Sequence, residues 1–127
     1  MNDRTSIKTV KLVQQIGPVL DWKTKQNRQF VDAVLALKNA EEAKLFLRDL
    51  MTEKEIKEFA NRLEAASLLS KDVQYSAIIN NTGLSSATIA RIAKWLKGSL
   101  GGYRLVLSRL SKHHTSPKFR KGLSLSS

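Results

Sequence analysis

The sequence has no cysteine among its 127 residues. This absence excludes disulfide bonds and thiol chemistry, and it is compatible with a reducing, intracellular location. No run of apolar residues approaches the length of a membrane span. The first 25 residues mix polar, charged and apolar side chains, unlike a secretory signal. We therefore expect a cytoplasmic protein with no membrane partner.

The residue patterns of common enzyme and metal sites are also missing. The chain has no glycine-rich phosphate loop of the Walker or Rossmann type, and no pair of acids set in a basic cleft. Its two histidines, His113 and His114, lie in a basic terminal segment without the further ligands that a structural zinc site needs. These absences predict a protein that is not an enzyme and that holds no metal or cofactor.

Acidic residues are absent after Asp72. Residues 1–72 hold 13 Lys and Arg with all 11 acids, whereas residues 73–127 hold 9 Lys and Arg and no acid. The net charge of +11 is therefore concentrated in the second segment, which predicts a polyanionic partner such as nucleic acid. A charge that only keeps the protein soluble, or that attracts anionic lipid, is the alternative.

The apolar residues recur at helical spacing, and no strand-like alternation is present, so we predict an all-α fold. Residues 1–24 form an amino-terminal arm, residues 25–110 the domain and residues 111–127 a basic, flexible tail. The arm is either a frayed segment or a short helix that ends at Gly17-Pro18. The apolar residues of that helix would be Ile7, Val10, Val13 and Ile16.

The first half of the domain predicts three helices. One covers residues 26–38, and Asn39 caps a second. A capping box of Thr52 and Glu55 starts a third helix, which runs to about Leu69. The apolar stripe of the first is Phe30, Val31, Val34 and Leu35, and the expected buried side of the second is Leu45, Phe46 and Leu50. The expected inner face of the third is Ile56, Phe59, Ala60, Leu63 and Ala66, and its length favours a dimer.

Residues 73–97 predict a helix-turn-helix. Gly83 supplies the sharp turn, Leu84 a buried anchor and Ser85 the cap of the second helix. Two short helices, about 73–81 and 86–97, flank this turn, and a final helix covers residues 103–110. Gly98 ends the second helix. Ile78 and Ile79 on the first helix would meet an apolar face of Ile89, Ile92, Ala93 and Leu96 on the second.

The outer face of helix 86–97 has the composition of a surface that reads the major groove. Small side chains at its leading end let the backbone approach base edges, and the later cations suit phosphates. An ordinary surface helix with small and basic residues is the alternative. The predicted DNA-binding residues are Ser85, Ser86, Ala87, Thr88, Ala90, Arg91, Lys94 and Lys97.

These motifs resemble the tryptophan repressor-like proteins, in particular their YerC/YecD-type branch. The resemblance covers residues 50–110 and extends back to about residue 26. The motifs that carry it are Leu50-Met51-Thr52 with Glu55, Asn61-Arg62-Leu63-Glu64, Thr82-Gly83-Leu84-Ser85-Ser86-Ala87-Thr88-Ile89-Ala90-Arg91 and Gly101-Gly102-Tyr103-Arg104-Leu105-Val106-Leu107. It implies an intertwined, all-helical homodimer that binds a two-fold symmetric operator in double-stranded DNA. Ser76 and Ile79 stand where the repressor has basic DNA contacts, so a different operator is expected.

The resemblance also implies an effector pocket, which Thr52, Arg62 and Arg91 would line. Ile92 stands where the repressor has a glycine, and Trp95 where it has a serine that holds the ligand. The hypothesis is therefore that bulky side chains fill the pocket, that tryptophan is not a corepressor and that Arg91 is free for phosphate. Ordinary packing of Trp95 is the simpler interpretation of that residue.

The predicted function is sequence-specific DNA binding for transcriptional regulation, in the cytoplasm and at the nucleoid. A nucleoid, replication-associated or RNA-binding factor with the same fold, without gene-specific regulation, is the first alternative. A module whose basic face binds an acidic protein is the second. Preference for a palindrome over random duplex, persisting as salt rises, separates the first prediction from both alternatives.

Overall fold

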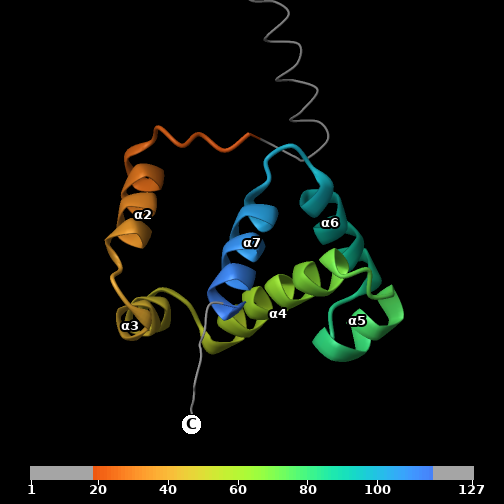
Figure 1. The fold of residues 1–127 in the computed structure, drawn as a ribbon. Helices are drawn as coiled ribbons and strands as arrows, with labels where there is room; N and C mark the ends of the chain where they lie inside the picture. Colours follow the sequence, from red (N-terminus) through yellow and green to blue (C-terminus); the bar gives the residue numbers. More distant parts are fainter. Residues whose placement is uncertain (1–18, 116–127) are drawn as a thin grey trace, which may run out of the picture. The chain divides into compact units, whose positions relative to one another are not determined.

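The computed structural model describes residues 19–115, with side chains to residue 112, and its regular structure is entirely helical over that range. The predicted all-α fold is confirmed. The arm helix predicted around residues 7–16 lies outside the described residues, as does the tail beyond residue 115. The helices of the described range are α2 (Lys25–Ala36), α3 (Ala40–Leu50), α4 (Glu53–Ser70), α5 (Tyr75–Thr82), α6 (Ser86–Lys97) and α7 (Gly102–Thr115) (Figure 1).

The last helix is longer than the sequence predicts. α7 begins at Gly102 and ends at Thr115, five residues beyond the expected end at Leu110. Residues 111–115 therefore belong to a helix and not to the predicted flexible tail. The physical reason is that no glycine or proline interrupts the chain between Gly102 and Pro117, and polar residues are no barrier to the continuation of a helix.

The chain divides into two compact units, Met1–Thr52 and Glu53–Ser127. In the described part of the first unit, α2 and α3 both begin at capping side chains. The Thr24 hydroxyl accepts the N–H of Asn27 at 3.1 Å. The Asn39 side chain accepts the N–H of Glu42 at 3.0 Å, which confirms the predicted cap. The Glu42 carboxylate in turn accepts the N–H of Lys38 at 2.9 Å, so both sides of the α3 start are satisfied.

The apolar residues of α2 and α3 are not buried. Neither helix contains a buried residue, and Leu45 is 70% exposed. The predicted burial of Leu45, Phe46 and Leu50 is therefore wrong within this single chain, where Phe46 is half-buried and the two leucines are exposed. An amphipathic helix buries its stripe only where another element covers it, and the two helices of this unit supply no further layer.

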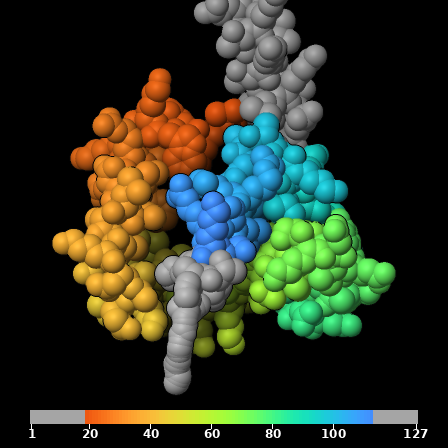
Figure 2. All heavy atoms as spheres, in the orientation of Figure 1, coloured from red at the N-terminus to blue at the C-terminus, as the bar shows by residue number. Residues whose placement is uncertain are grey.

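The core of the second unit lies where α5 and α6 pack on α4. Ala65 and Ala66 of α4 are fully buried, and they cluster with Ile78 of α5 and with Ile89 and Ile92 of α6. Small side chains on α4 let the two shorter helices approach it closely. α4 also contacts α7, and α7 lies directly against α6 (Figure 2).

The predicted inner face of α4 is only partly correct. Ala66 is buried as expected, but Ile56 is half-buried, and Phe59, Ala60 and Leu63 are exposed. α4 therefore uses its later turns for the core of its own unit, while its earlier apolar residues remain uncovered. Periodicity identified an apolar face that is wider than the one this unit covers.

The end of α4 has the geometry of a Schellman motif, with Asp72 in the left-handed conformation (φ 62°). The N–H of Val73 donates to the Leu68 carbonyl at 3.1 Å, and the N–H of Asp72 donates to the Leu69 carbonyl at 3.0 Å. Val73 and Leu68 both pack against the core. This turn directs the chain from α4 into α5.

The turn between α5 and α6 contains Gly83 in the left-handed conformation, with φ at 73°. Its N–H donates to the Ile79 carbonyl at 2.8 Å and so closes α5. A β-carbon at this position would meet nothing within 4 Å. The requirement for glycine is therefore conformational and not a matter of space.

We predict that Gly83→Ala lowers the free energy of unfolding by about 1–2 kcal/mol, the cost of the left-handed conformation for a residue with a β-carbon. Gly83→Asn should lose less, because asparagine tolerates this conformation. Urea denaturation at one fixed protein concentration measures both variants. Equal losses for the two substitutions would show that something other than backbone conformation limits the turn.

Candidate nucleic-acid interface

The turn before α6 is stabilised by a buried threonine that the sequence reasoning missed. The Thr82 hydroxyl donates to the Ile78 carbonyl at 2.7 Å and accepts the N–H of Leu84 at 3.2 Å. Leu84, the predicted anchor, is half-buried and packs against the core. The signal available in the sequence was the position of Thr82 directly before Gly83, because a threonine hydroxyl can bond to nearby backbone groups at a helix end.

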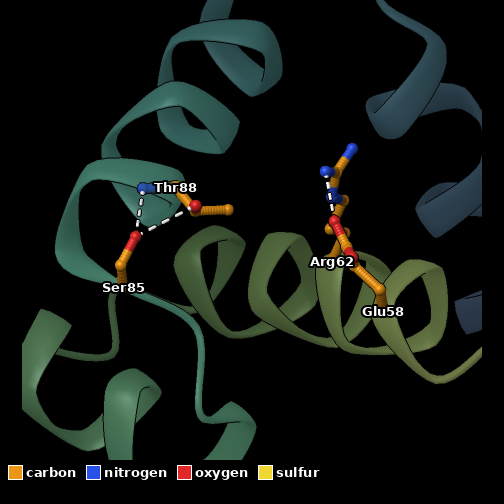
Figure 3. A network of polar contacts seen from close by, with 4 residues as sticks. All are labelled: Glu58, Arg62, Ser85 and Thr88. Carbon is orange, nitrogen blue, oxygen red and sulfur yellow. Dashed lines mark hydrogen bonds and ion pairs between the residues drawn. The ribbon is translucent and has the colours of Figure 1, made fainter. Parts of the chain in front are cut away.

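The first turn of α6 is fixed by Ser85. Its hydroxyl oxygen accepts the N–H of Thr88 at 3.1 Å, which is the predicted cap, and its O–H donates to the Thr88 hydroxyl oxygen at 3.0 Å (Figure 3). Ser85 is exposed, whereas Thr88 is half-buried. The two hydroxyls are thus paired with each other, and Thr88 lies at the side of α6 and not on its fully exposed face.

α6 has two opposite faces of different chemistry. Ile89, Ile92 and Leu96 are buried, as their spacing predicts. The exposed face carries Ser86, Ala87, Ala90, Arg91, Lys94 and Lys97. The structure therefore brings six of the eight predicted DNA-binding residues onto one exposed surface, with Ser85 at its leading end and Thr88 at its edge.

The cations of this surface have no acidic neighbours in their own segment. No ion pair involves Arg91, Lys94 or Lys97 within the part of the chain that the structure describes. The first turn of α6 has no acid, so its free N–H groups and positive dipole end also favour an anion. A surface of this kind can attract phosphates, while its small leading side chains leave room for a close approach.

A pocket of about 340 Å³ lies beside α6. Its lining consists of Arg62, Thr88, Arg91, Ile92, Trp95 and Tyr103. Arg62 and Arg91, two of the three predicted effector residues, are therefore brought together. Thr52, the third, belongs to the first unit and is not part of this lining.

Arg62 already has partners within α4. Its guanidinium donates to the Glu58 carboxylate at 2.6 Å (Figure 3) and lies 5.4 Å from the centre of the Phe59 ring. Its Nε atom is buried and makes no hydrogen bond. Ile92 and Trp95 both border the pocket. Sequence reasoning missed Glu58 as the residue that holds Arg62, although its spacing of four residues is the usual one for a helical ion pair.

The described residues offer little for other kinds of site. None of the helices in residues 19–115 is long and apolar enough to cross a membrane. In the same range no cluster of three or more His, Asp or Glu side chains could hold a metal ion. The side chains of His113 and His114 lie outside the described set.

Comparison with known proteins gives consistent matches. The family model described as "Trp repressor protein" matches residues 25–111. The "Uncharacterized protein YerC" of Bacillus subtilis (strain 168) is 36% identical over 91 residues, which cover 72% of this chain and 88% of that protein. A crystal structure of a TrpR-like protein from Eubacterium eligens ATCC 27750 aligns with a TM-score of 0.67 at 37% identity, covering 71% of this chain and 93% of the other.

The family match and the fold agree with each other and with the resemblance that the motifs indicate. The fold neighbour shares the all-helical architecture, and the matched region contains every helix from α2 to most of α7. The chain therefore belongs to the Trp repressor-like family, in its YerC-type branch.

Proposed function

We propose that this protein is a transcriptional regulator that binds double-stranded DNA in a sequence-specific manner through α6. The observation that carries the proposal is the exposed face of α6, where small side chains precede three cations that have no ion-pair partner among the described residues. The family supports it, since helix-turn-helix proteins place the second helix in the major groove. Such a protein would act in the cytoplasm, at the nucleoid.

The proposal gives each residue of α6 a role. Ser86, Ala87 and Ala90 meet base edges, where a methyl group can contact a thymine methyl and a hydroxyl can bond to a base. Ser85 and Thr88 flank these residues and fix the first turn by their mutual hydrogen bond. Arg91, Lys94 and Lys97 neutralise phosphates.

We further propose that the functional unit is a homodimer. α2 has no buried residue, and its apolar stripe is exposed, with Leu35 at 76%. In the second unit a groove of about 730 Å³ lies between α4 and α7, and Leu63 and Leu110 are among its lining residues. Apolar side chains gathered on an exposed helix face are typical of protein interfaces, and a second copy would supply a matching apolar surface. Two copies related by a two-fold axis would present two α6 helices to a palindromic site.

Selection of bound sites from a random duplex pool tests the function. We expect a two-fold symmetric consensus that competes better than random duplex, with a preference that persists as salt rises. Equal competition by random duplex would favour the nucleoid or replication-associated alternative, and stronger binding to RNA would favour an RNA-binding factor. Binding of acidic polypeptides in place of duplex would favour the protein-interaction alternative.

Two substitutions on α6 should act differently on the selected duplex. Lys94→Ala should weaken binding to every duplex and reduce the salt slope by about 0.9, the loss of one phosphate contact. Ala87→Leu should reduce the preference for the selected site by about tenfold or more, because the bulky side chain displaces base contacts. Lys57→Ala, at an exposed lysine of α4, is the matched control for charge. If Lys94→Ala and Ala87→Leu acted alike on all duplexes, the division of α6 into base and phosphate contacts would be wrong.

We predict that free tryptophan does not bind as a corepressor. No acidic side chain lines the pocket to hold the ammonium group of the ligand, and the Arg62 guanidinium is already paired with the Glu58 carboxylate. Calorimetry should therefore show no saturable heat at micromolar tryptophan, and tryptophan should leave the affinity for the selected duplex unchanged. Duplex binding by the same preparation controls for folding. Micromolar saturable binding would overturn the prediction.

The mass of the protein in solution tests the proposed homodimer. Sedimentation should give twice the 14.2 kDa chain mass for the wild type. Val34→Glu should shift the population toward the monomer, because a charge in an apolar interface loses its hydration. Gln29→Glu, at an exposed residue on the opposite side of α2, should leave the mass unchanged. A wild-type mass of one chain at all concentrations would contradict the homodimer.

A further inference from the structure

The carboxyl end of α6 is held by a side chain from the next helix. The Arg104 guanidinium, on the first turn of α7, donates to the Leu96 carbonyl at 2.5 Å and to the Gly98 carbonyl at 2.7 Å. One Nη atom makes both hydrogen bonds. We refer to this pair of bonds as the Arg104 clamp.

The clamp supplies hydrogen-bond donors to backbone carbonyls at the carboxyl end of α6. The last carbonyls of a helix have no partner within the helix, and the helix dipole is negative there. A guanidinium offers both a positive charge and charge-assisted donors, so it satisfies these carbonyls better than water or a neutral group. Lys94 and Lys97 lie in the same turn, but both are exposed, and it is Arg104 that donates to these carbonyls.

Gly101 makes room for the clamp. Its φ of 75° lies in the left-handed region, and a β-carbon built on it would stand 3.0 Å from Nη2 of Arg104. A side chain at this position would therefore strain the backbone, and the Arg104 guanidinium would have to shift by a few tenths of an ångström. Gly102 differs, since a β-carbon there would meet nothing within 4 Å. Of the two adjacent glycines, only Gly101 is required by the clamp.

We propose that Arg104 is a positioning residue that fixes the direction in which α6 meets DNA. Ser85 holds the amino end of α6 and Arg104 its carboxyl end, and neither residue is part of the face with the small side chains and cations. α7 also exposes Leu105, Val106 and Leu110, and Leu110 lines the groove assigned above to the dimer. The clamp therefore joins the DNA-reading helix to a helix of the dimer surface and sets the separation of the two α6 helices.

This inference rests on the proposed function, and it competes with a simpler role for Arg104. Arg104 is an exposed cation in the basic segment of the chain, so it could contact a phosphate directly. Replacement of Arg104 by lysine distinguishes the two roles. Lysine keeps the charge for a phosphate contact, but its nitrogen lies one bond nearer the backbone than the Nη atom of arginine, on a flexible stem without the preorganised planar group, so it does not reach both carbonyls in the same way.

The experiment compares binding of the selected and random duplexes by the wild type and four variants. Arg104→Lys and Gly101→Ala should each lower the ratio of the two affinities by about tenfold or more, the equivalent of one good base contact. Both should keep the wild-type salt slope on random duplex. Gly102→Ala, the matched control, should keep the wild-type ratio. Arg104→Ala removes the charge as well, so its difference from Arg104→Lys measures the effect of the charge on duplex affinity.

Amide hydrogen exchange provides a measurement that needs no DNA. Residues 95–98 should exchange faster in Arg104→Lys and Gly101→Ala than in the wild type and Gly102→Ala, while the amides of α4 keep their protection. A loss of α4 protection in Arg104→Lys would overturn the proposal, because Arg104 would then support the fold as a whole and not the placement of α6.

Two further outcomes would separate the possible failures. If Arg104→Lys keeps the affinity ratio, and Arg104→Ala weakens every duplex alike with a shallower salt slope, Arg104 is a phosphate contact and the clamp proposal is wrong. If the wild type itself shows no sequence preference, the proposed function fails. Unchanged exchange at residues 95–98 would then overturn the clamp independently.

Discussion

The packing of three isoleucines on two alanines is the contact on which the rest of the second unit depends. Ala65 and Ala66 give α4 a flat surface, and Ile78, Ile89 and Ile92 fill the space above it. Because all five side chains are buried, the positions of α5 and α6 on α4 are set together. Burial of one face of α6 is also what leaves its opposite face, with small and basic side chains, open to solvent.

The ends of α6 depend on polar groups and not on the core. A serine cap fixes its amino end, the Thr82 hydroxyl satisfies the turn before it, and a guanidinium from α7 satisfies the carbonyls at its carboxyl end. These bonds are directional, whereas apolar packing is not. The core therefore gives α6 its place. In the proposed function, the caps would restrict the rotation and tilt of a helix that reads base edges.

The two units differ in how much of their apolar surface a single chain buries. The second unit has a continuous core, whereas α2 and α3 are well capped and have no buried residue. Caps define where these helices begin, but they contribute little to stability without burial of an apolar stripe. The proposed homodimer would account for this imbalance, because a second copy of the chain would cover the exposed apolar faces of α2, α4 and α7.

The sequence by itself determined the local features. Periodicity and caps located the described helices to within about two residues, except for the end of α7, which lies five residues later than predicted. Gly83 and Ser85 identified the turn, and the motifs around them identified the family. These features depend on neighbours in the chain, which a sequence displays directly. Tertiary structure alone decided which part of the α4 stripe is buried, that Thr88 turns toward the pocket with Arg62, and that Arg104 binds the end of α6. Each of these depends on how closely separate helices approach, and periodicity does not specify that distance.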